Sequence, residues 1–276
     1  MDEGAGLDRV GDDFVRLATQ NALPGAALNP GSEGNAMDQI IDINTRFGPI
    51  PTAPSDWLLD ELVAMMQAHH VAAACTLSTV GMLLDATAGN AATRAACLEN
   101  RRLLPVATLN PLHYFREESP IPRLVADGFR MVRFFPALQG WSGHFAPFLA
   151  ACEELASTPL PIMIETPAPG VASPIVRELA DYPAAVILSQ VHQEGLTEAV
   201  ALMQRYPNVY IETSDMVSMG AIGIVSRHVG ADRVVFGSGA PSRPIAGVLS
   251  ALQHAGLDPA DLQKVLSGNA RRILGL

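Results

Sequence analysis

Eight short apolar segments, separated by stretches with helical patterns, constrain the fold of this sequence most strongly. Each segment is nearly continuous in apolar residues instead of alternating apolar with polar ones. That pattern is typical of parallel strands that are covered on both faces. The eight predicted strands span residues 39–44, 72–78, 103–110, 128–135, 161–166, 185–191, 208–214 and 233–238.

The stretches between these segments predict helices. Ser55, Asn90 and Asp258 are expected to cap three of them, and Pro259 suits the first turn of the last one. Eight strand–helix units over about 235 residues predict an α/β fold of the (β/α)8 TIM-barrel type. A doubly wound open sheet is the alternative, although such sheets more often hold fewer strands. Four further helices are predicted at residues 143–156, 173–181, 195–206 and 217–229.

Residues 1–36 do not follow this pattern, so the barrel domain is placed at residues 37–276. Leu7, Val10 and Phe14 lie at helical spacing, which predicts a short helical extension before a linker rich in small residues. The favoured role of this extension is to cover one end of the barrel, and an interface role is the alternative.

Composition excludes some classes of partner. The net charge of −10 and pI of about 5.1 argue against nucleic acid or an anionic membrane. The N-terminus is acidic and lacks the features of a signal peptide, and no apolar run is long enough to span a membrane. Cys75, Cys97 and Cys152 are widely spaced and are expected to be free thiols. We therefore expect a cytoplasmic protein, and the sequence leaves open a homo-oligomer.

In a TIM barrel, functional side chains come from the carboxyl ends of the strands and from the loops that follow. The first predicted strand ends in an unusual polar pair, since it delivers Asn44 and Arg46. Ser78 and Ser238 have no adjacent His that would support a Ser-His-Asp system, and no phosphate-binding glycine motif follows a strand. The strand-end candidates are Asn44, Arg46, Ser78, Asn110, His113, Arg133, Glu165, Gln190, His192, Glu212, Asp215, Ser238 and Gly239.

Several phrases occur in a characteristic order: IDINTRFG, GFRMVRFFP, PIMIETP, VILSQV, RYPNVYIETS, GADRVVFGSGAP and GNARRILGL. Through them the chain from about residue 40 to its end resembles the amidohydrolase superfamily, and most closely its amidohydrolase-related branch of metal-dependent hydrolases and decarboxylases. The resemblance implies a (β/α)8 barrel with one or two divalent metals, which activate a water for hydrolysis or assist decarboxylation.

The resemblance also implies where the metal ligands would lie, and this sequence departs from the family at those positions. Zinc requires three or four nitrogen, sulfur or carboxylate donors that converge on one point. Lys264 lies in the last helix, so it cannot replace the bridging lysine of some relatives. We therefore predict no bound metal and no other cofactor. The family's His-x-His of the first strand corresponds to Asn44 and Arg46, its fifth-strand His to Glu165, its sixth-strand His to Gln190 and its eighth-strand Asp to Gly239.

The first functional hypothesis is a metal-independent hydrolase of a small carboxylated lactone, amide or ester. Arg46 and Arg133 would bind the carboxylate, and Glu165 or His192 would move the proton. The remaining candidates for substrate binding are Asn44 and Gln190, which would polarise a carbonyl, together with Trp141, His144 and Arg243 around the mouth of the barrel.

The sequence is also compatible with other roles for these residues. Arg46 and Glu165 could form a buried ion pair without catalytic meaning. The loop that carries Trp141 and His144 could be ordinary barrel cover, and Glu212 is expected to hydrogen-bond at a strand end. The whole chain could be an inactive relative that binds a small anion or a partner subunit, or it could be a decarboxylase or lyase. Whether it is an enzyme is left open by the sequence.

Overall fold

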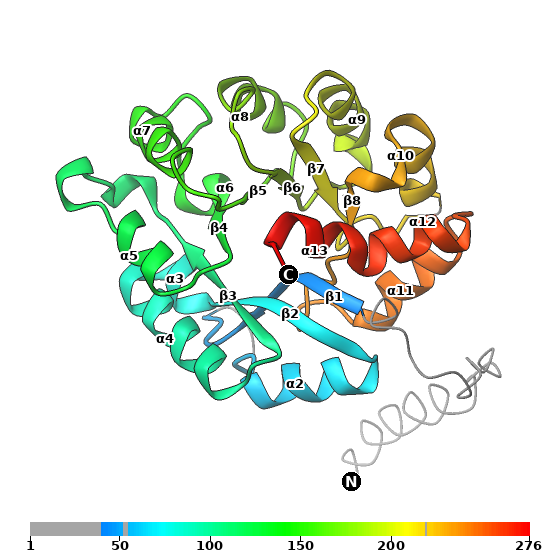
Figure 1. The fold of residues 1–276 in the computed structure, drawn as a ribbon, viewed down its shortest axis with the longest axis horizontal. Helices are drawn as coiled ribbons and strands as arrows, with labels where there is room; N and C mark the ends of the chain where they lie inside the picture. Colours follow the sequence, from blue (N-terminus) through cyan, green and yellow to red (C-terminus); the bar gives the residue numbers. More distant parts are fainter. Residues whose placement is uncertain (1–39, 52–54, 219) are drawn as a thin grey trace, which may run out of the picture. The chain divides into compact units, whose positions relative to one another are not determined.

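The computed structural model describes residues 40–51, 55–218 and 220–276 (Figure 1). Eight strands form one parallel sheet in the order of the sequence. Their near-continuous apolar character is explained by burial on both faces. The strands are β1 (Ile40–Phe47), β2 (Val71–Ser78), β3 (Leu103–Thr108), β4 (Met131–Phe134), β5 (Ile162–Glu165), β6 (Val186–Ser189), β7 (Val209–Glu212) and β8 (Val234–Val235).

The sheet closes on itself because the last strand and its following loop pair with the first strand. The backbone N–H of Ile43 donates to the carbonyl of Phe236 at 3.0 Å, and that of Gly239 donates to Asn44 at 2.8 Å. Thr45 and Ala240 continue the pairing as a parallel bridge. The prediction of a TIM barrel is therefore confirmed, and the open-sheet alternative is wrong.

Helices surround the strands (Figure 1). Among the described residues, no helix is both long and apolar enough to cross a membrane. The α-helices are α2 (Leu59–Ala68), α3 (Thr79–Leu83), α4 (Ala86–Glu99), α5 (Ile121–Ala126), α6 (Pro136–Gln139), α7 (Ala146–Leu155), α8 (Ala172–Glu178), α9 (Leu196–Arg205), α10 (Ala221–Val229), α11 (Ile245–Gln253), α12 (Pro259–Gln263) and α13 (Asn269–Leu274). The 3-10 turns are η1 (Pro111–His113), η2 (Arg116–Glu118), η3 (Gln193–Gly195) and η4 (Ala231–Arg233), and η5 (Lys264–Gly268) is a π-helical segment.

Two of the three predicted helix caps are wrong. Helix α2 begins at Leu59 and not near Ser55, because Trp57 is held by backbone hydrogen bonds with Gly48 at 2.7 and 3.0 Å. Asn90 lies inside α4, whose cap is Asp85.

The side chain of Asn90 serves tertiary structure instead of a helix end. Its amide donates to the carbonyl of Thr108 at 2.9 Å and accepts from the Thr108 N–H at 2.8 Å, which attaches α4 to the end of β3. The third cap is confirmed, since the Asp258 carboxylate accepts from the N–H of Asp261 at 2.8 Å.

Apolar side chains fill the barrel below its carboxyl end. Each fully buried large aliphatic side chain contributes roughly 1.5–3 kcal/mol. Helix α13 adds Ala270 and Leu274 to this cluster. The strand contributors are Ile41, Ile43, Cys75, Leu77, Val106, Met131, Met163, Ile187, Tyr210 and Val235.

The three cysteines are free, as predicted. Residues 1–36, for which a helix and a linker were predicted, lie outside the described residues. The boundary placed at residue 37 lies there as well, so both remain predictions.

Candidate functional site

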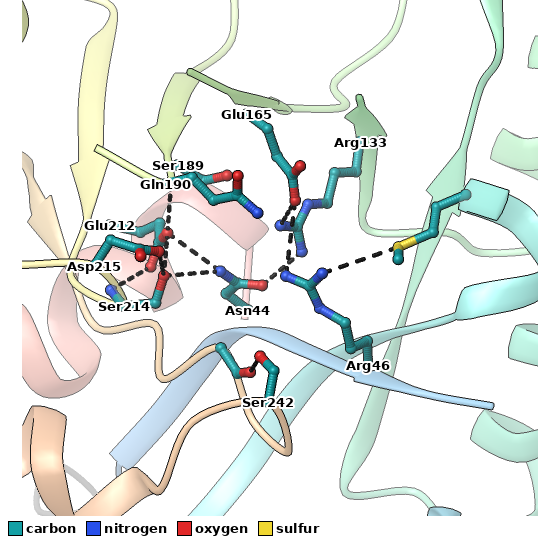
Figure 2. Close-up of polar contacts among 12 residues, drawn as sticks. Asn44, Arg46, Arg133, Glu165, Ser189, Gln190, Glu212, Ser214, Asp215 and Ser242 are labelled. Carbon is teal, nitrogen blue, oxygen red and sulfur yellow. Dashed lines mark hydrogen bonds and ion pairs between the residues drawn. The ribbon is translucent and has the colours of Figure 1, made fainter. Parts of the chain in front are cut away.

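A bulge in β1 aims the first polar side chains into the mouth of the barrel. Between Asp42 and Thr45 the register advances three residues along β1 but only two along β2. Ile43 still belongs to the apolar cluster inside the barrel. The extra residue allows Asn44 and Arg46 to face the interior as well, as Figure 2 shows. Bulges beside functional sites commonly re-aim side chains in this way.

Asp42 holds this bulge in place. Its Oδ1 accepts hydrogen bonds from the backbone N–H groups of Asn44 and Ser238, both at 3.0 Å. Complete burial raises the pKa of the carboxyl to about 6, although hydrogen bonds to Ser238 and Asn44 oppose the shift. Asp42 thereby joins β1 to the loop that follows β8. It was not predicted as a site residue, and an acid inside an apolar strand was the only sequence signal for it.

Three side chains, Asn44, Arg133 and Glu165, form what we call the closed network. Arg133 is only 1% exposed, and its guanidinium donates to Asn44 Oδ1 at 2.5 Å and to Glu165 Oε1 at 2.7 Å. The guanidinium carbon also lies 5.0 Å from the ring centroid of Phe135. The network thus links β1, β4 and β5. Glu165 is 6% exposed, and its nearer cationic partner is Arg133, since Arg46 lies 3.7 Å away.

Glu212 lies on the other side of Asn44 (Figure 2). Its Oε1 is 3.2 Å from the Asn44 amide and 2.7 Å from the Ser214 hydroxyl, and its Oε2 accepts from the Ser214 N–H at 2.7 Å. Gly237 leaves room for this carboxyl, because a Cβ there would come within 2.4 Å of Oε2. The predicted hydrogen bonding at a strand end is confirmed.

Burial raises the pKa of Glu212 to about 7, while hydrogen bonds from Ser214 and the charge of Arg133 oppose the shift. The Ser214 hydroxyl also lies 3.1 Å from Asp215 Oδ2. A protonated Glu212 can therefore donate to Ser214, which donates onward to Asp215. This chain of hydrogen bonds connects the interior of the barrel with its mouth.

Arg46 is bound far less completely than Arg133. It is 7% exposed, yet its described polar contacts are Met82 Sδ at 3.9 Å and the Glu165 carboxylate at 3.7 Å. Its guanidinium carbon lies 6.0 Å from the Trp57 ring centroid. Burial, together with the charge of Arg133, lowers the pKa of Arg46 to about 10. Arg46 is therefore a cation at neutral pH with unused hydrogen-bond donors.

Arg46 borders a cavity of about 500 Å³, which we call the open cavity. Four of the predicted site residues line this cavity: Arg46, Gln190, His192 and Arg243. It also brings in residues that the sequence did not single out for binding. The complete lining is Arg46, Trp57, Gln190, His192, Ser214, Asp215, Gly239, Ser242 and Arg243.

His192, Asp215 and Arg243 form a second charged group at this cavity. His192 Nδ1 lies 3.3 Å from Asp215 Oδ1, and Arg243 Nη2 donates to the same oxygen. The local backbone is unusual, because Gln190 adopts a left-handed conformation with φ of 56° directly after β6. Such conformations are costly for a residue with a side chain and occur preferentially at functional sites.

The structure places two predicted ligand contacts away from the open cavity. Trp141 packs against Phe148 with ring centroids 4.8 Å apart, and its Nε1 donates to Gln139 at 3.0 Å. His144 is exposed and lies 3.5 Å from Glu178. Both positions correspond to the alternative interpretation of this loop as barrel cover. Glu165 also does not border the cavity, because two guanidinium groups enclose it.

The absence of a divalent metal stays a prediction, and it concerns the surroundings of Asn44, Arg46, Glu165, Gln190 and Gly239. Among the described residues, no three His, Cys, Asp or Glu side chains are grouped so as to hold one. Asn44 and Glu165 already direct an oxygen each to the guanidinium of Arg133. Gly239 has φ of 72° and contributes no side chain. Lys264 forms an ion pair with Asp261 at 2.9 Å.

Solved structures with the same architecture include several enzymes. A dihydroxybenzoic acid decarboxylase from Polaromonas, solved with manganese and an inhibitor, is 15% identical, with a TM-score of 0.69 over 86% of this chain and 97% of that one. The 5-carboxyvanillate decarboxylase of Sphingomonas paucimobilis is 14% identical, with a TM-score of 0.70 over 86% and 99%. A probable 2-pyrone-4,6-dicarboxylic acid hydrolase from Acinetobacter baumannii, with citric acid bound, is 15% identical, with a TM-score of 0.67 over 86% and 100%.

These identities are low, so the structural likeness carries the fold alone. No curated protein gives a significant sequence match. The sequence does match the profile of the family described as Amidohydrolase, and the match spans residues 42–276, which is nearly the whole barrel. The chain therefore belongs to the amidohydrolase family.

Proposed function

We propose that this protein is a metal-independent member of the amidohydrolase family that binds a small carboxylate-bearing molecule in the open cavity. The observation that carries the proposal is Arg46, a buried cation that borders about 500 Å³ of space with most of its donors unused. Buried polar groups are normally hydrogen-bonded, so an under-partnered guanidinium beside a cavity calls for a ligand.

The closed network supports the metal-independent part of the proposal. Arg133 supplies a permanent positive charge among the residues that correspond to the family's metal ligands. Two unit charges 4 Å apart repel by roughly 4 kcal/mol at an effective dielectric constant of 20, and a divalent ion would double that cost. The carboxylate of Glu165 offsets one of the two arginine charges, so a metal beside these three side chains would still face one net positive charge from them.

A carboxylate is the ligand class that the charges of the open cavity favour. Guanidinium groups bind carboxylates through paired hydrogen bonds of defined geometry. Arg46 has donors available, and Arg243 adds a second guanidinium whose charge is shared with Asp215. The similar structures are named for benzoic, vanillic and pyrone carboxylic acids, which adds support for this class.

Glu165 serves this site by neutralising charge. Its carboxylate faces both Arg133 and Arg46, and a base must be free to approach a substrate proton. Deletion of Glu165 would leave two buried guanidinium groups without an anion. We therefore assign Glu165 to the closed network and not to proton transfer.

The proposal is tested by isothermal titration calorimetry with three ligands that share a benzene ring and differ in the number of carboxylates: isophthalate, benzoate and benzamide. We expect affinity to fall in that order, since two, one and no carboxylates are presented. Arg46→Met should weaken isophthalate binding about 10- to 100-fold, because it removes a desolvated charge pair. Arg123→Met, which removes an arginine paired with Asp127 on the barrel surface, is the matched control and should bind normally. Equal affinity for benzamide and isophthalate would overturn the proposal.

A further inference from the structure

We propose that His192 and Asp215 form a water-activating pair, which makes the open cavity a metal-free site for hydrolysis of a carboxylate-bearing ester or lactone. This inference rests on the proposed function, because the substrate's carboxylate must be held by Arg46 while its acyl group reaches His192. Both residues of the pair border the same cavity as Arg46.

The geometry of the pair assigns a role to each ring nitrogen. Nδ1 of His192 faces Asp215 Oδ1 at 3.3 Å. A neutral imidazole with its proton on Nδ1 donates to that carboxylate and leaves the Nε2 lone pair available. A base oriented by a third group is the arrangement that activates water or a nucleophile. His192 is suited to exchange protons with solvent, because 42% of its side chain is exposed.

Asp215 is in turn held by neighbours, so its direction is fixed. Arg243 donates to Oδ1, and the Ser214 hydroxyl lies 3.1 Å from Oδ2. The left-handed turn at Gln190 directs the chain so that His192 reaches this carboxylate. Asp215 therefore acts as a positioning residue that also stabilises the imidazolium formed during proton transfer.

The reaction balances without a metal or a redox partner. Nε2 of His192 accepts a proton from water as the water oxygen bonds to the acyl carbon, and the carbonyl electron pair moves to its oxygen. The side-chain amide of Gln190, on the same cavity, donates to that oxygen. Collapse of the tetrahedral intermediate breaks the bond between the acyl carbon and the leaving oxygen. The imidazolium returns its proton to the leaving oxygen, which yields an acid and an alcohol.

Other groups at the mouth are less suited to this role. Glu165 is enclosed by the guanidinium groups of Arg46 and Arg133. The Ser214 hydroxyl lies against the carboxylates of Glu212 and Asp215, and its described contacts include no imidazole. A serine nucleophile with a histidine base therefore lacks its base.

Mono-4-nitrophenyl glutarate tests the inference, because it combines a free carboxylate with an ester whose hydrolysis releases a coloured product. We expect turnover at neutral pH, and His192→Gln should lower kcat about 100-fold or more while glutarate still binds. Asp215→Asn should lower kcat with little change in KM, and Asp215→Glu should restore part of it. His254→Gln, a change at an exposed histidine that does not line the open cavity, is the matched control and should leave kcat unchanged. Thermal denaturation of each variant checks that it is folded.

The outcomes separate the two proposals. Glutarate binding by the wild type, without ester turnover above that of His192→Gln, overturns the water-activating pair and leaves the carboxylate site intact. Turnover that survives His192→Gln also overturns it. If the wild-type protein binds neither glutarate nor isophthalate, the proposed function itself is overturned.

Discussion

Two arginines a few ångströms from the same carboxylate differ in how completely they are bound. Arg133 makes hydrogen bonds of 2.5 and 2.7 Å within the closed network, whereas the nearest oxygen partner of Arg46 is 3.7 Å away. Both are almost fully buried, so exposure does not distinguish them. What distinguishes them is that Arg46 borders the open cavity and Arg133 does not.

The difference indicates two separate roles for positive charge at one barrel mouth. A buried charge with close charged and polar partners stabilises a conformation, and its removal strands the partner charge. A buried charge with unused donors beside a cavity is available to a ligand. Stability and binding should therefore respond oppositely to changes at the two positions.

The largest expected effect is on stability at Arg133. Arg133→Met should lower the free energy of unfolding by about 3–5 kcal/mol, because Glu165 and Asn44 lose their buried partner. Urea denaturation measures the loss. The double variant Arg133→Met/Glu165→Met should recover part of it, since no carboxylate is then stranded and only Arg46 loses its more distant partner at 3.7 Å. A loss below about 1 kcal/mol in the single variant Arg133→Met would show that the closed network does not stabilise the fold as stated.

The next effect is a pH dependence at Glu212, where the closed network meets the open cavity. Its pKa is raised from 4.5 to about 7 in the folded chain. The folded state therefore holds a proton that the unfolded state has lost, so this stabilising contribution is complete below pH 4.5 and disappears as pH rises through 7. Glu212→Gln removes the titration, and its stability relative to wild type should rise by about 2–3 kcal/mol between pH 5 and pH 8. A flat difference across that range, in urea titrations, would contradict the assignment.

Arg46 should show the reverse of Arg133. Arg46→Met should change the free energy of unfolding by less than about 1 kcal/mol, because the lost contacts are long and the desolvation cost of a charge is relieved. The same variant should lose isophthalate binding. A stability loss as large as that of Arg133→Met would mean that both arginines are structural.

The smallest effect is expected at His144. His144→Ala should alter stability by less than about 0.5 kcal/mol and leave isophthalate affinity unchanged, because the ring is exposed and outside the open cavity. Calorimetry and urea denaturation of one preparation provide both values. Weakened binding in this variant would extend the site to the loop after β4.

Most of the barrel could be predicted because parallel strands covered on both faces leave continuous apolar segments in the sequence. The strand ends then placed Arg46, Gln190 and His192 at one mouth, as topology requires. Helix caps were harder to predict from the sequence. Asn90 is a residue type that often caps helices, but its side-chain amide instead hydrogen-bonds the backbone of Thr108.

The partners within the site depended on geometry that the sequence does not encode locally. The bulge that brings both Ile43 and Asn44 inside is held by Asp42, through a bond to a residue near the other end of the chain. Glu165 was expected to face Arg46, yet Arg133 reaches it first because β4 and β5 are adjacent strands. Trp57 lines the cavity because an antiparallel backbone bridge to Gly48 holds it there, and no periodic pattern in the sequence predicts that bridge.

The most direct test of the central claim is the metal content of the closed network. The protein is dialysed against excess zinc or manganese, passed over a chelating resin and analysed by mass spectrometry. Arg133 already donates to Asn44 Oδ1 and to Glu165 Oε1, so we predict less than about 0.1 equivalent of metal per chain. One equivalent that survives the resin and disappears in Glu165→Gln would contradict the account.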